Sequence, residues 1–455
     1  MKRFMVLFST CLVLVALLAA CASPAATTAP AAPAATSAPA ATTAPAAPAA
    51  TTAPAAEKPA EVKEVVIGAI YPMTGASAQI GQDAKNAIDL AVEIVNGKYD
   101  IGLPLAAEEG LPNLGGAKVR VVYGDHQAEP EKGQAEAERL ITQENVVALM
   151  GSYHSSVTQV GSQVAERMGI PWLCPESSSA TLHTRGLKYF FRTTPHDGVF
   201  SQAMFDYMAF LKETKGVEIK KVALFHEDTL FGTSSANAQT EIAKNLGFEI
   251  VADVKYTQNA TSLNAEVLTI KAANPDVLLV TSYPSDAILF VKTSEELGYT
   301  APLVIAQNAG YVEPNFVEAV GAQATGLLSR AVWSSELFAK KPIAAKINEL
   351  YKAKAGKDIA DNSAREFTGA IVLFDAINRA GSTDPAAIQK ALMETDMSGD
   401  QLIMPWPGIK FDPATGQNTL STAMMIQLQE GKYRIVWPAE VATSELIYPN
   451  PTWGN

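Results

Sequence analysis

From Val62 onward, short β-branched apolar runs alternate regularly with amphipathic stretches, and this alternation limits the chain to few folds. In the first series the runs predict strands over 64–70, 118–125 and 146–150, and the stretches predict helices over 83–96, 131–144 and 156–168. Strands that alternate with helices pair in parallel, and the helices cover both faces of the sheet. Ligands of such sheets bind beyond the carboxyl ends of the strands, so the loops that follow the strands are the candidate site.

The alternation restarts after Phe190 and predicts a second, similar unit. Its expected helices are 198–212, 233–246, 263–273 and 285–297, and its expected strands are 221–228, 248–255, 275–283 and 302–306. Two more helices over 343–355 and 363–380 precede a β-rich end over 409–436, with a turn at Glu430 and Gly431. We therefore predict an α/β protein of two doubly wound parallel-sheet lobes with a ligand cleft between them.

The first twenty residues have the pattern of a bacterial lipoprotein signal peptide. Lys2 and Arg3 precede an apolar run that ends in the sequence LAAC at Leu18–Cys21. Leucine, two small residues and cysteine form a lipobox, so we expect cleavage before Cys21 and attachment of lipid to its sulfur. The apolar run is short for an uncleaved membrane span, which needs about 20 helical residues.

Residues 21–61 consist almost wholly of Ala, Pro, Thr and Ser, and Thr27–Ala41 repeats as Thr42–Ala56 with one change. Such a composition buries no core and predicts an extended, disordered tether between the lipid and the folded part.

Composition excludes several classes of function. The formal net charge of −12 argues against a nucleic-acid partner. After processing, Cys174 is the only cysteine left besides Cys21, so no disulfide within the chain is expected. The sequence has no G-x-G-x-x-G, Walker or H-E-x-x-H motif, and we expect no cofactor and no metal site.

Polar residues follow the third expected strand, in the sequence ALMGSYHSSVTQ. The apolar run stops at Gly151, and Ser155 and Ser156 stand where a helix begins. Free N–H groups and the positive end of the helix dipole favour an anion there. The alternative is that one serine only caps the helix. A second stretch of the same chemistry, PWLCPESSSATL, follows one β-α unit later and contains Glu176 and Ser178.

The ordered set of these motifs resembles the type I periplasmic solute-binding proteins of ABC importers, in the family that binds leucine, isoleucine and valine or amides. The strings that carry the resemblance include GAIYPMTGASAQIGQ, GSYHSSVTQV, FRTTPHD, HEDTLFG and DNSAREFTGAIVLFDAINRAG. The resemblance implies interleaved lobes joined by about three crossovers, near Thr193, Ser329 and Gly408. The implied division is 62–193 plus 329–408 for the first lobe and 194–328 plus 409–455 for the second.

The resemblance also implies which residues hold the ligand. Hydroxyl and main-chain N–H groups that match Ser155, Ser156, Ser178 and Glu176 would hold a carboxylate. Aromatic residues that match Phe231 and Tyr283 would cover the ligand, and Tyr71 is a further candidate. The family usually places an acid against the ligand's ammonium, and the matching residue here is Gln307. That departure leaves an ordinary amino acid less certain as ligand, unless Asp286, Glu227 or Asp228 supplies the charge.

We therefore expect a lipid-anchored binding protein that delivers a small amino acid, amide or related carboxylate to an ABC permease in the membrane. Branched-chain amino acids, short amides, urea and aromatic acids all stay open as ligands. One alternative is a sensing module for a membrane receptor. Another is a periplasmic hydrolase built on Asp125, His154 and Ser155, although no nucleophile motif accompanies these residues.

Overall fold

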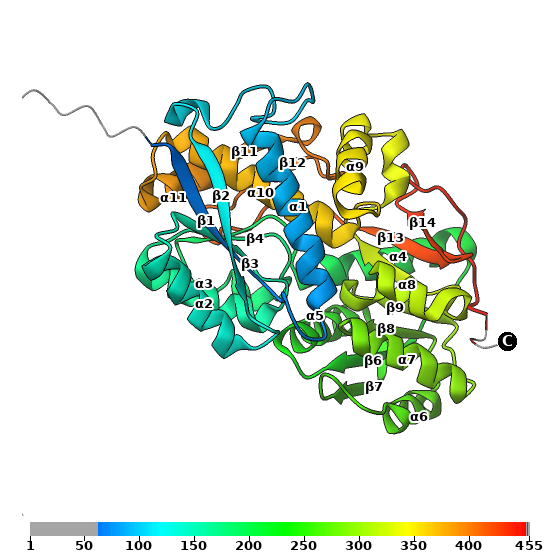
Figure 1. Ribbon diagram of the computed structural model, residues 1–455. Helices are drawn as coiled ribbons and strands as arrows, with labels where there is room; N and C mark the ends of the chain where they lie inside the picture. Colours follow the sequence, from blue (N-terminus) through cyan, green and yellow to red (C-terminus); the bar gives the residue numbers. More distant parts are fainter. Residues whose placement is uncertain (1–61, 452, 454–455) are drawn as a thin grey trace, which may run out of the picture. The chain divides into compact units, whose positions relative to one another are not determined.

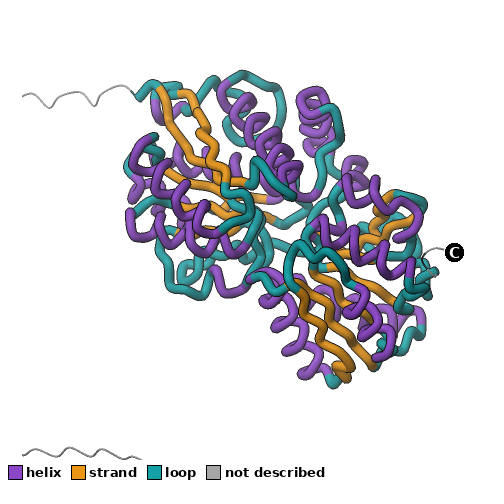
Figure 2. The backbone as a smooth tube through the Cα atoms, turned by 60° about the horizontal axis from the view of Figure 1, so that its bottom comes forward, coloured by secondary structure: helices purple, strands orange, loops and turns teal. Residues whose placement is uncertain are grey.

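The structure, a computed structural model, describes residues 62–451 and 453. The predicted signal peptide, the lipidation site Cys21 and the tether lie outside the described residues. From Ala60 onward the chain forms one compact unit, in which the strands separate into two groups (Figures 1 and 2).

The first sheet is parallel and five-stranded, with the strand order β2-β1-β3-β4-β5. Its strands are β1 (Glu64–Tyr71), β2 (Lys118–Asp125), β3 (Ala148–Gly151), β4 (Trp172–Cys174) and β5 (Phe190–Arg192). The helices that connect them are α1 (Ala78–Asn96), α2 (Pro130–Gln143) and α3 (Ser155–Met168). β3, β4 and β5 are buried along their whole length, because helices cover both faces of a parallel sheet.

The second sheet has seven strands in the order β14-β13-β10-β9-β8-β6-β7. Its strands are β6 (Lys221–Glu227), β7 (Glu249–Tyr256), β8 (Val277–Thr281), β9 (Leu303–Ala306), β10 (Leu328–Ala331), β13 (Met424–Gln429) and β14 (Lys432–Trp437). Its helices are α4 (Asp197–Lys215), α5 (Leu230–Leu246), α6 (Asn264–Ala273), α7 (Pro284–Glu296) and α8 (Pro314–Val320). β13 and β14 are antiparallel and turn at Glu430 and Gly431, which both have positive φ, as expected for the predicted turn.

The remaining elements return to the first lobe. They are α9 (Pro342–Ala355), α10 (Asp361–Ala380), α11 (Pro385–Met393) and the short pair β11 (Asp396–Ser398) and β12 (Gly408–Lys410). Apolar residues of α9, α10 and α11 share a core with β1 and α1, and α10 packs along α1. The two-lobed α/β fold expected from the sequence is therefore confirmed.

Strand pairing indicates where the chain passes from one lobe to the other. β10 pairs with β9 and β13 of the second sheet, so the passage back to the first lobe comes after Ala331. β12 pairs with β11, so the last passage comes after Lys410. The division into 62–193 plus 329–408 and 194–328 plus 409–455 stays a proposal. Strand pairing moves its boundary between 328 and 329 to after Ala331, and its boundary between 408 and 409 to after Lys410.

Several helices begin earlier than their apolar pattern predicted, because polar residues cap them. α5 starts at Leu230 rather than Thr233, since the Thr229 hydroxyl accepts a hydrogen bond from the Gly232 N–H at 3.1 Å. α4 starts at Asp197, where Nδ1 of His196 accepts a hydrogen bond from the Gly198 N–H at 3.1 Å.

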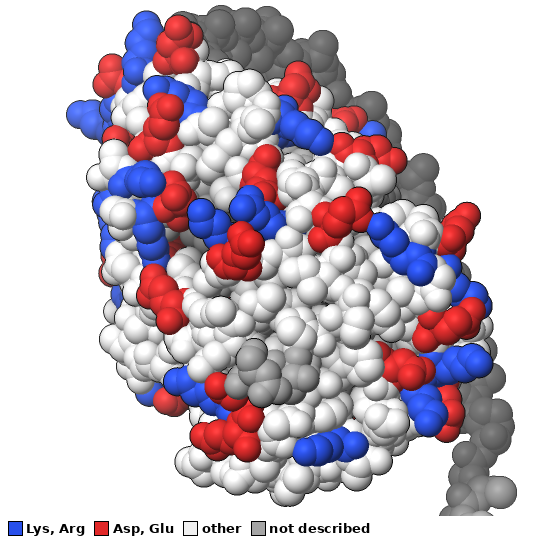
Figure 3. All heavy atoms as spheres, turned by 90° about the vertical axis from the view of Figure 1, so that its right-hand side faces the viewer, with Lys and Arg blue, Asp and Glu red and all other residues white. Residues whose placement is uncertain are grey.

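On the face in Figure 3, acidic and basic side chains are interspersed rather than gathered into a stripe of one sign. Among the described helices, none combines the length and the apolar character needed to cross a bilayer.

Close packing of α3 on the first sheet yields a prediction of stability. A Cβ atom added to Gly161 would lie 2.6 Å from an indole carbon of Trp172. The Trp172 N–H donates to the Gly151 carbonyl at 3.0 Å, so the ring is held in place. We expect Gly161→Ala to lower the free energy of unfolding by about 1–3 kcal/mol through overpacking, although alanine is the better helix former. Urea denaturation checks this, with the exposed Gln163→Ala on the same helix as the control; an unchanged midpoint for Gly161→Ala would contradict it.

Candidate functional site

Loops at the strand ends of both sheets meet around one small cavity. Its volume is about 20 Å3, which is room for about one water molecule in this arrangement. The first lobe contributes Tyr153, Glu176, Ser178 and Arg365, and the second contributes Phe231, Tyr283, Asn308, Ala309 and Arg330. The cavity is therefore a site that exists only where the two lobes face each other.

Aromatic rings form one wall of the cavity. The ring of Tyr283 lies 5.4 Å from Tyr153, 5.4 Å from Phe231 and 4.5 Å from His154, measured between ring centroids. Tyr153, Phe231, Tyr283 and Ala309 form a buried apolar cluster with Ile80. This wall suits the apolar body of a small ligand and excludes water from it.

Charged groups form the other wall. Arg365 on α10 contacts Glu176 at 3.2 Å and also pairs with Asp361. Its guanidinium donates to the Asn308 side-chain oxygen at 3.0 Å, which joins the two lobes. Burial raises the pKa of the Glu176 carboxyl, and the positive charge of Arg365 acts in the opposite direction. One oxygen of Glu176 finds no hydrogen-bond partner among the described residues and is available to a ligand.

A buried arginine positions the loop that carries Glu176 and Ser178. Arg192, at the end of β5, donates to the carbonyl oxygens of Ser177 at 3.1 Å and Ser179 at 2.7 Å. These bonds fix the backbone on both sides of Ser178. Ser178, which lines the cavity, is therefore held on a fixed backbone rather than on a free loop.

Of the eight residues that the sequence singled out, the structure brings four to the cavity: Glu176, Ser178, Phe231 and Tyr283. Ser155 is buried at the start of α3, and its hydroxyl accepts a hydrogen bond from the Ser179 N–H at 3.4 Å. Ser156 is the next residue of α3 and is half-buried. Neither serine is among the residues that line the cavity.

The other two predicted residues lie behind the cavity wall. The Tyr71 hydroxyl donates to the buried carboxylate of Glu366. The Gln307 amide nitrogen donates to Asp197 at 3.2 Å, and no hydrogen-bond partner of its oxygen is found within the described chain. The carboxylate of Asp197 thus lies beside Gln307, the residue that stands where the family usually has an acid.

Five cavity residues were not predicted as ligand contacts: Tyr153, Asn308, Ala309, Arg330 and Arg365. Tyr153 lies inside the predicted cradle sequence, and Asn308 is the neighbour of Gln307. Both therefore lie next to residues that the sequence did predict. Arg330 interrupts an apolar strand, and Arg365 lies on a helix that is buried almost throughout. A charge in such a segment is itself a signal of function, because it is rarely buried without a partner.

Three carboxylates are candidates to replace the acid that the family usually has at the position of Gln307. Asp286 accepts hydrogen bonds from the N–H groups of Asn259 at 2.8 Å and Ala260 at 3.1 Å, so it holds a loop. Asp228 is exposed and accepts from the Gln258 N–H at 3.2 Å. Glu227 is fully buried, and both its oxygens are unpartnered within residues 62–451 and 453.

The hydrolase set does not assemble. Nε2 of His154 lies 3.5 Å from the Ser77 hydroxyl, and the carboxylate of Asp125 accepts from Met73 N–H at 2.9 Å. The rings that pack on His154 belong to Tyr283 at 4.5 Å, Tyr153 at 5.0 Å and His126 at 5.3 Å, measured between centroids. Within the described part of the chain, no group of three or more metal-ligating side chains is found either.

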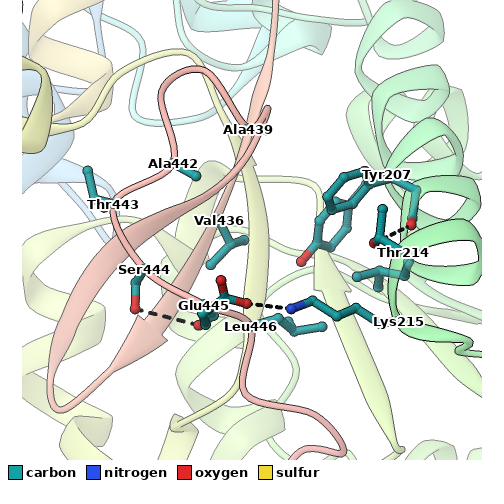
Figure 4. A pocket seen from close by; sticks show the side chains of 12 residues that line it. Tyr207, Thr214, Lys215, Val436, Ala439, Ala442, Thr443, Ser444, Glu445 and Leu446 are labelled. Atoms are coloured by element: carbon teal, nitrogen blue, oxygen red, sulfur yellow. Dashed lines mark hydrogen bonds and ion pairs between the residues drawn. The ribbon is translucent and has the colours of Figure 1, made fainter.

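A wider groove lies elsewhere, between α4 and the segment that follows β14 (Figure 4). Its charged pair, Lys215 and Glu445, is largely exposed to solvent. Its lining contains no carboxylate or guanidinium group that is both buried and unpartnered among the residues described, although the Tyr207 hydroxyl is buried without a partner. The convergent, buried polar groups favour the smaller cavity as the ligand site.

Comparisons with known proteins identify the family. A family model described as periplasmic binding protein matches residues 64–432. A Leu/Ile/Val-binding protein homologue of Brucella abortus is 30% identical over 396 residues, which cover 85% of this chain and 94% of that protein.

Two solved structures have the same fold. A leucine-binding protein of Thermotoga maritima is 25% identical with a TM-score of 0.69, over 82% of this chain and 97% of its own. A branched-chain amino acid transporter substrate-binding protein of Streptococcus pneumoniae, solved with isoleucine, is 22% identical with a TM-score of 0.68, over 85% and 100%. These relatives are binding proteins rather than enzymes, so the hydrolase hypothesis is abandoned.

Glu227 yields a prediction of pH dependence. Burial raises the pKa of its carboxyl well above the ordinary value of 4.5. In the unfolded chain this group loses its proton near pH 4.5, whereas the folded state keeps it, so stability falls as pH rises above that value. Glu227→Gln removes the acidic proton and keeps the shape. Its stability relative to the wild type should therefore rise between pH 5 and pH 8, by about 1.4 kcal/mol for every pH interval of one over which only the folded state holds the proton.

Urea denaturation at the two pH values measures this difference. The control is Glu241→Gln on the exposed face of α5, whose effect should change by less than about 0.5 kcal/mol. A Glu227→Gln effect that is the same at both pH values would show that the carboxyl titrates normally.

Proposed function

Since the chain belongs to the periplasmic binding protein family, we propose that it is the lipid-anchored, substrate-binding component of an ABC importer. It captures a small amino acid, amide or related carboxylate by closure of its two lobes outside the cytoplasm. The observation that carries this proposal is the cavity itself, which takes four lining residues from one lobe and five from the other.

Contacts between the lobes support capture by closure. The Ala180 N–H of the first lobe donates to the Ser234 hydroxyl of the second at 3.0 Å. Arg365 and Asn308 make a second such bond inside the cavity. A ligand that touches both walls favours the closed arrangement over an open one, as in hinge-type domain closure.

The chemistry of the two walls supports the class of ligand. The aromatic wall takes an apolar body, while Ser178 and the charged wall take polar ends. The ligands named for the similar proteins, leucine and isoleucine, make branched-chain amino acids the first candidates. The start of α3, with Ser155 and Ser156, remains part of the proposed cradle because its N–H groups favour an anion.

The partner and the anchor follow from the family and from the N-terminal sequence. Binding proteins of importers deliver their ligand to a permease in the membrane, so we propose such a permease as the protein partner. The lipobox at Leu18–Cys21 supports attachment to the outer face of that membrane through Cys21.

A thermal-shift screen tests the proposed function. The protein is heated with amino acids, short amides, urea and aromatic acids, and each hit is confirmed by calorimetry. A ligand present at 100 times its dissociation constant stabilises the folded state by about 2.7 kcal/mol, so we expect a clear rise in Tm for one class. A folded protein that is stabilised by none of them would contradict the proposal.

Ser178 yields a mutational prediction. We expect Ser178→Ala to weaken binding of the ligand found in the screen by about 1.5–3 kcal/mol, the range for a hydrogen bond to a charged group. Calorimetric titration measures this loss. Ser285→Ala, on the exposed side of α7, is the matched control and should leave the affinity unchanged. Equal affinities for the two variants would remove Ser178 from the site.

A further inference from the structure

Arg330 is a buried cation that forms no side-chain hydrogen bond or ion pair with the residues that the structure describes. It lies on β10, is 2% exposed and lines the cavity. Its Nε and Nη1 atoms find no hydrogen-bond acceptor among residues 62–451 and 453. Arg330 also takes no part in the ion pairs that the described side chains form around the cavity, which use Arg365 instead.

The contrast with Arg365 is informative. Arg365 is equally buried, but it pairs with Glu176 and Asp361 and donates to two asparagine side chains. Those contacts account for Arg365 as a structural group. Arg330 carries the same guanidinium group and lines the same cavity, but it does not make these contacts.

The surroundings hold Arg330 in one orientation and keep it charged. Its guanidinium carbon lies 3.4 Å from the centroid of the Phe200 ring on α4, so one face of the group is covered. Burial lowers its pKa to about 9, and the nearby positive charge of Arg365 acts in the same direction. Asp361, Asp197 and Glu176 favour the charged form from a longer range. Arg330 is therefore a cation at neutral pH.

Burial of an unpaired charge is strongly unfavourable, because the group loses its hydration without a bonded counter-charge. A rigid guanidinium presents parallel N–H donors that match the two oxygens of a carboxylate. The aromatic wall formed by Tyr153, Phe231 and Tyr283 borders the same small space.

We propose that Arg330 binds a carboxylate group of the ligand and thereby selects small acids with an apolar body over neutral amides and urea. This inference rests on the proposed function and deepens it, since it chooses one chemical class from those left open. The apolar body lies against the aromatic wall, and Arg330 supplies the counter-charge from the second lobe.

The first test needs no ligand. In the ligand-free full chain, Arg330→Met removes a charge that has no bonded partner, so we expect a urea midpoint equal to or higher than that of the wild type. Arg120→Met, which removes an exposed arginine paired with Glu64, controls for loss of surface charge. A clearly lower midpoint for Arg330→Met alone would overturn the proposal, because it would make Arg330 a structural group.

The second test uses a simple probe. Sodium acetate should raise the Tm of the wild type above its value in sodium chloride of the same ionic strength, whereas acetamide should not. The acetate effect should disappear in Arg330→Met and persist in part in Arg330→Lys. Equal shifts in wild type and Arg330→Met, including no shift in either, would overturn the proposal.

The third test uses the strongest hit of the ligand screen and its amide. We expect the acid to bind the wild type at least 10-fold more tightly than its amide, and Arg330→Met to lose about 10- to 100-fold for the acid and less than 2-fold for the amide. A hit without a carboxylate, or an acid that binds Arg330→Met undiminished, would overturn this inference while the importer function stands. If the screen finds no ligand but acetate acts through Arg330, the importer function fails and the anion site stands.

Discussion

The hydrogen bonds of Arg192 hold together the parts of the molecule on which the site depends. This fully buried guanidinium fixes the loop around Ser178 through two carbonyl oxygens. It also donates to the Gln417 side chain at 2.6 Å, and the backbone of Arg192 pairs with Gly416 and Asn418. Arg192 therefore connects three segments: the loop around Ser178, the first passage between the lobes and the last passage between them. Its burial is tolerable because neutral acceptors satisfy the charge from several sides.

The cavity shows the opposite arrangement, in which buried ionisable groups are left incompletely satisfied. Arg330 and Glu176, which both line it, have atoms without partners among the residues described. Such groups reduce the stability of the folded state, and proteins keep them at sites where function needs them. The stability of this protein and its affinity for ligand are thus linked through the same few side chains. Arg192 and Arg330 differ in this respect although both are buried arginines.

The sequence alone predicted most of the fold, because hydrophobic period and strand-helix order are local properties. It also pointed to the loops at the strand ends, which contain Glu176 and Ser178, since strand ends of parallel sheets lie along one edge. Phe231 and Tyr283 were predicted from the family resemblance, and the structure places all four residues at the cavity. Arg330 and Arg365 were missed, because their approach to the cavity depends on crossovers that bring β10 and α10 beside loops far away in the chain. The pairing of Gln307 with Asp197 spans 110 positions and has no local signature either.

The distribution of cavity residues between the lobes links recognition to closure. Ser178 and Glu176 belong to the first lobe, while Arg330 and the rings of Phe231 and Tyr283 belong to the second. A ligand that reaches only one set gains nothing from closure and leaves the equilibrium between open and closed forms unchanged. A ligand that pairs with Arg330 and also reaches Ser178 bridges the lobes and stabilises the closed form by the sum of both contacts. Under the proposed function, the contacts that discriminate between ligands are also the contacts that bring the lobes together. Selection of the ligand and the change of outer surface presented to the proposed permease then occur in the same step.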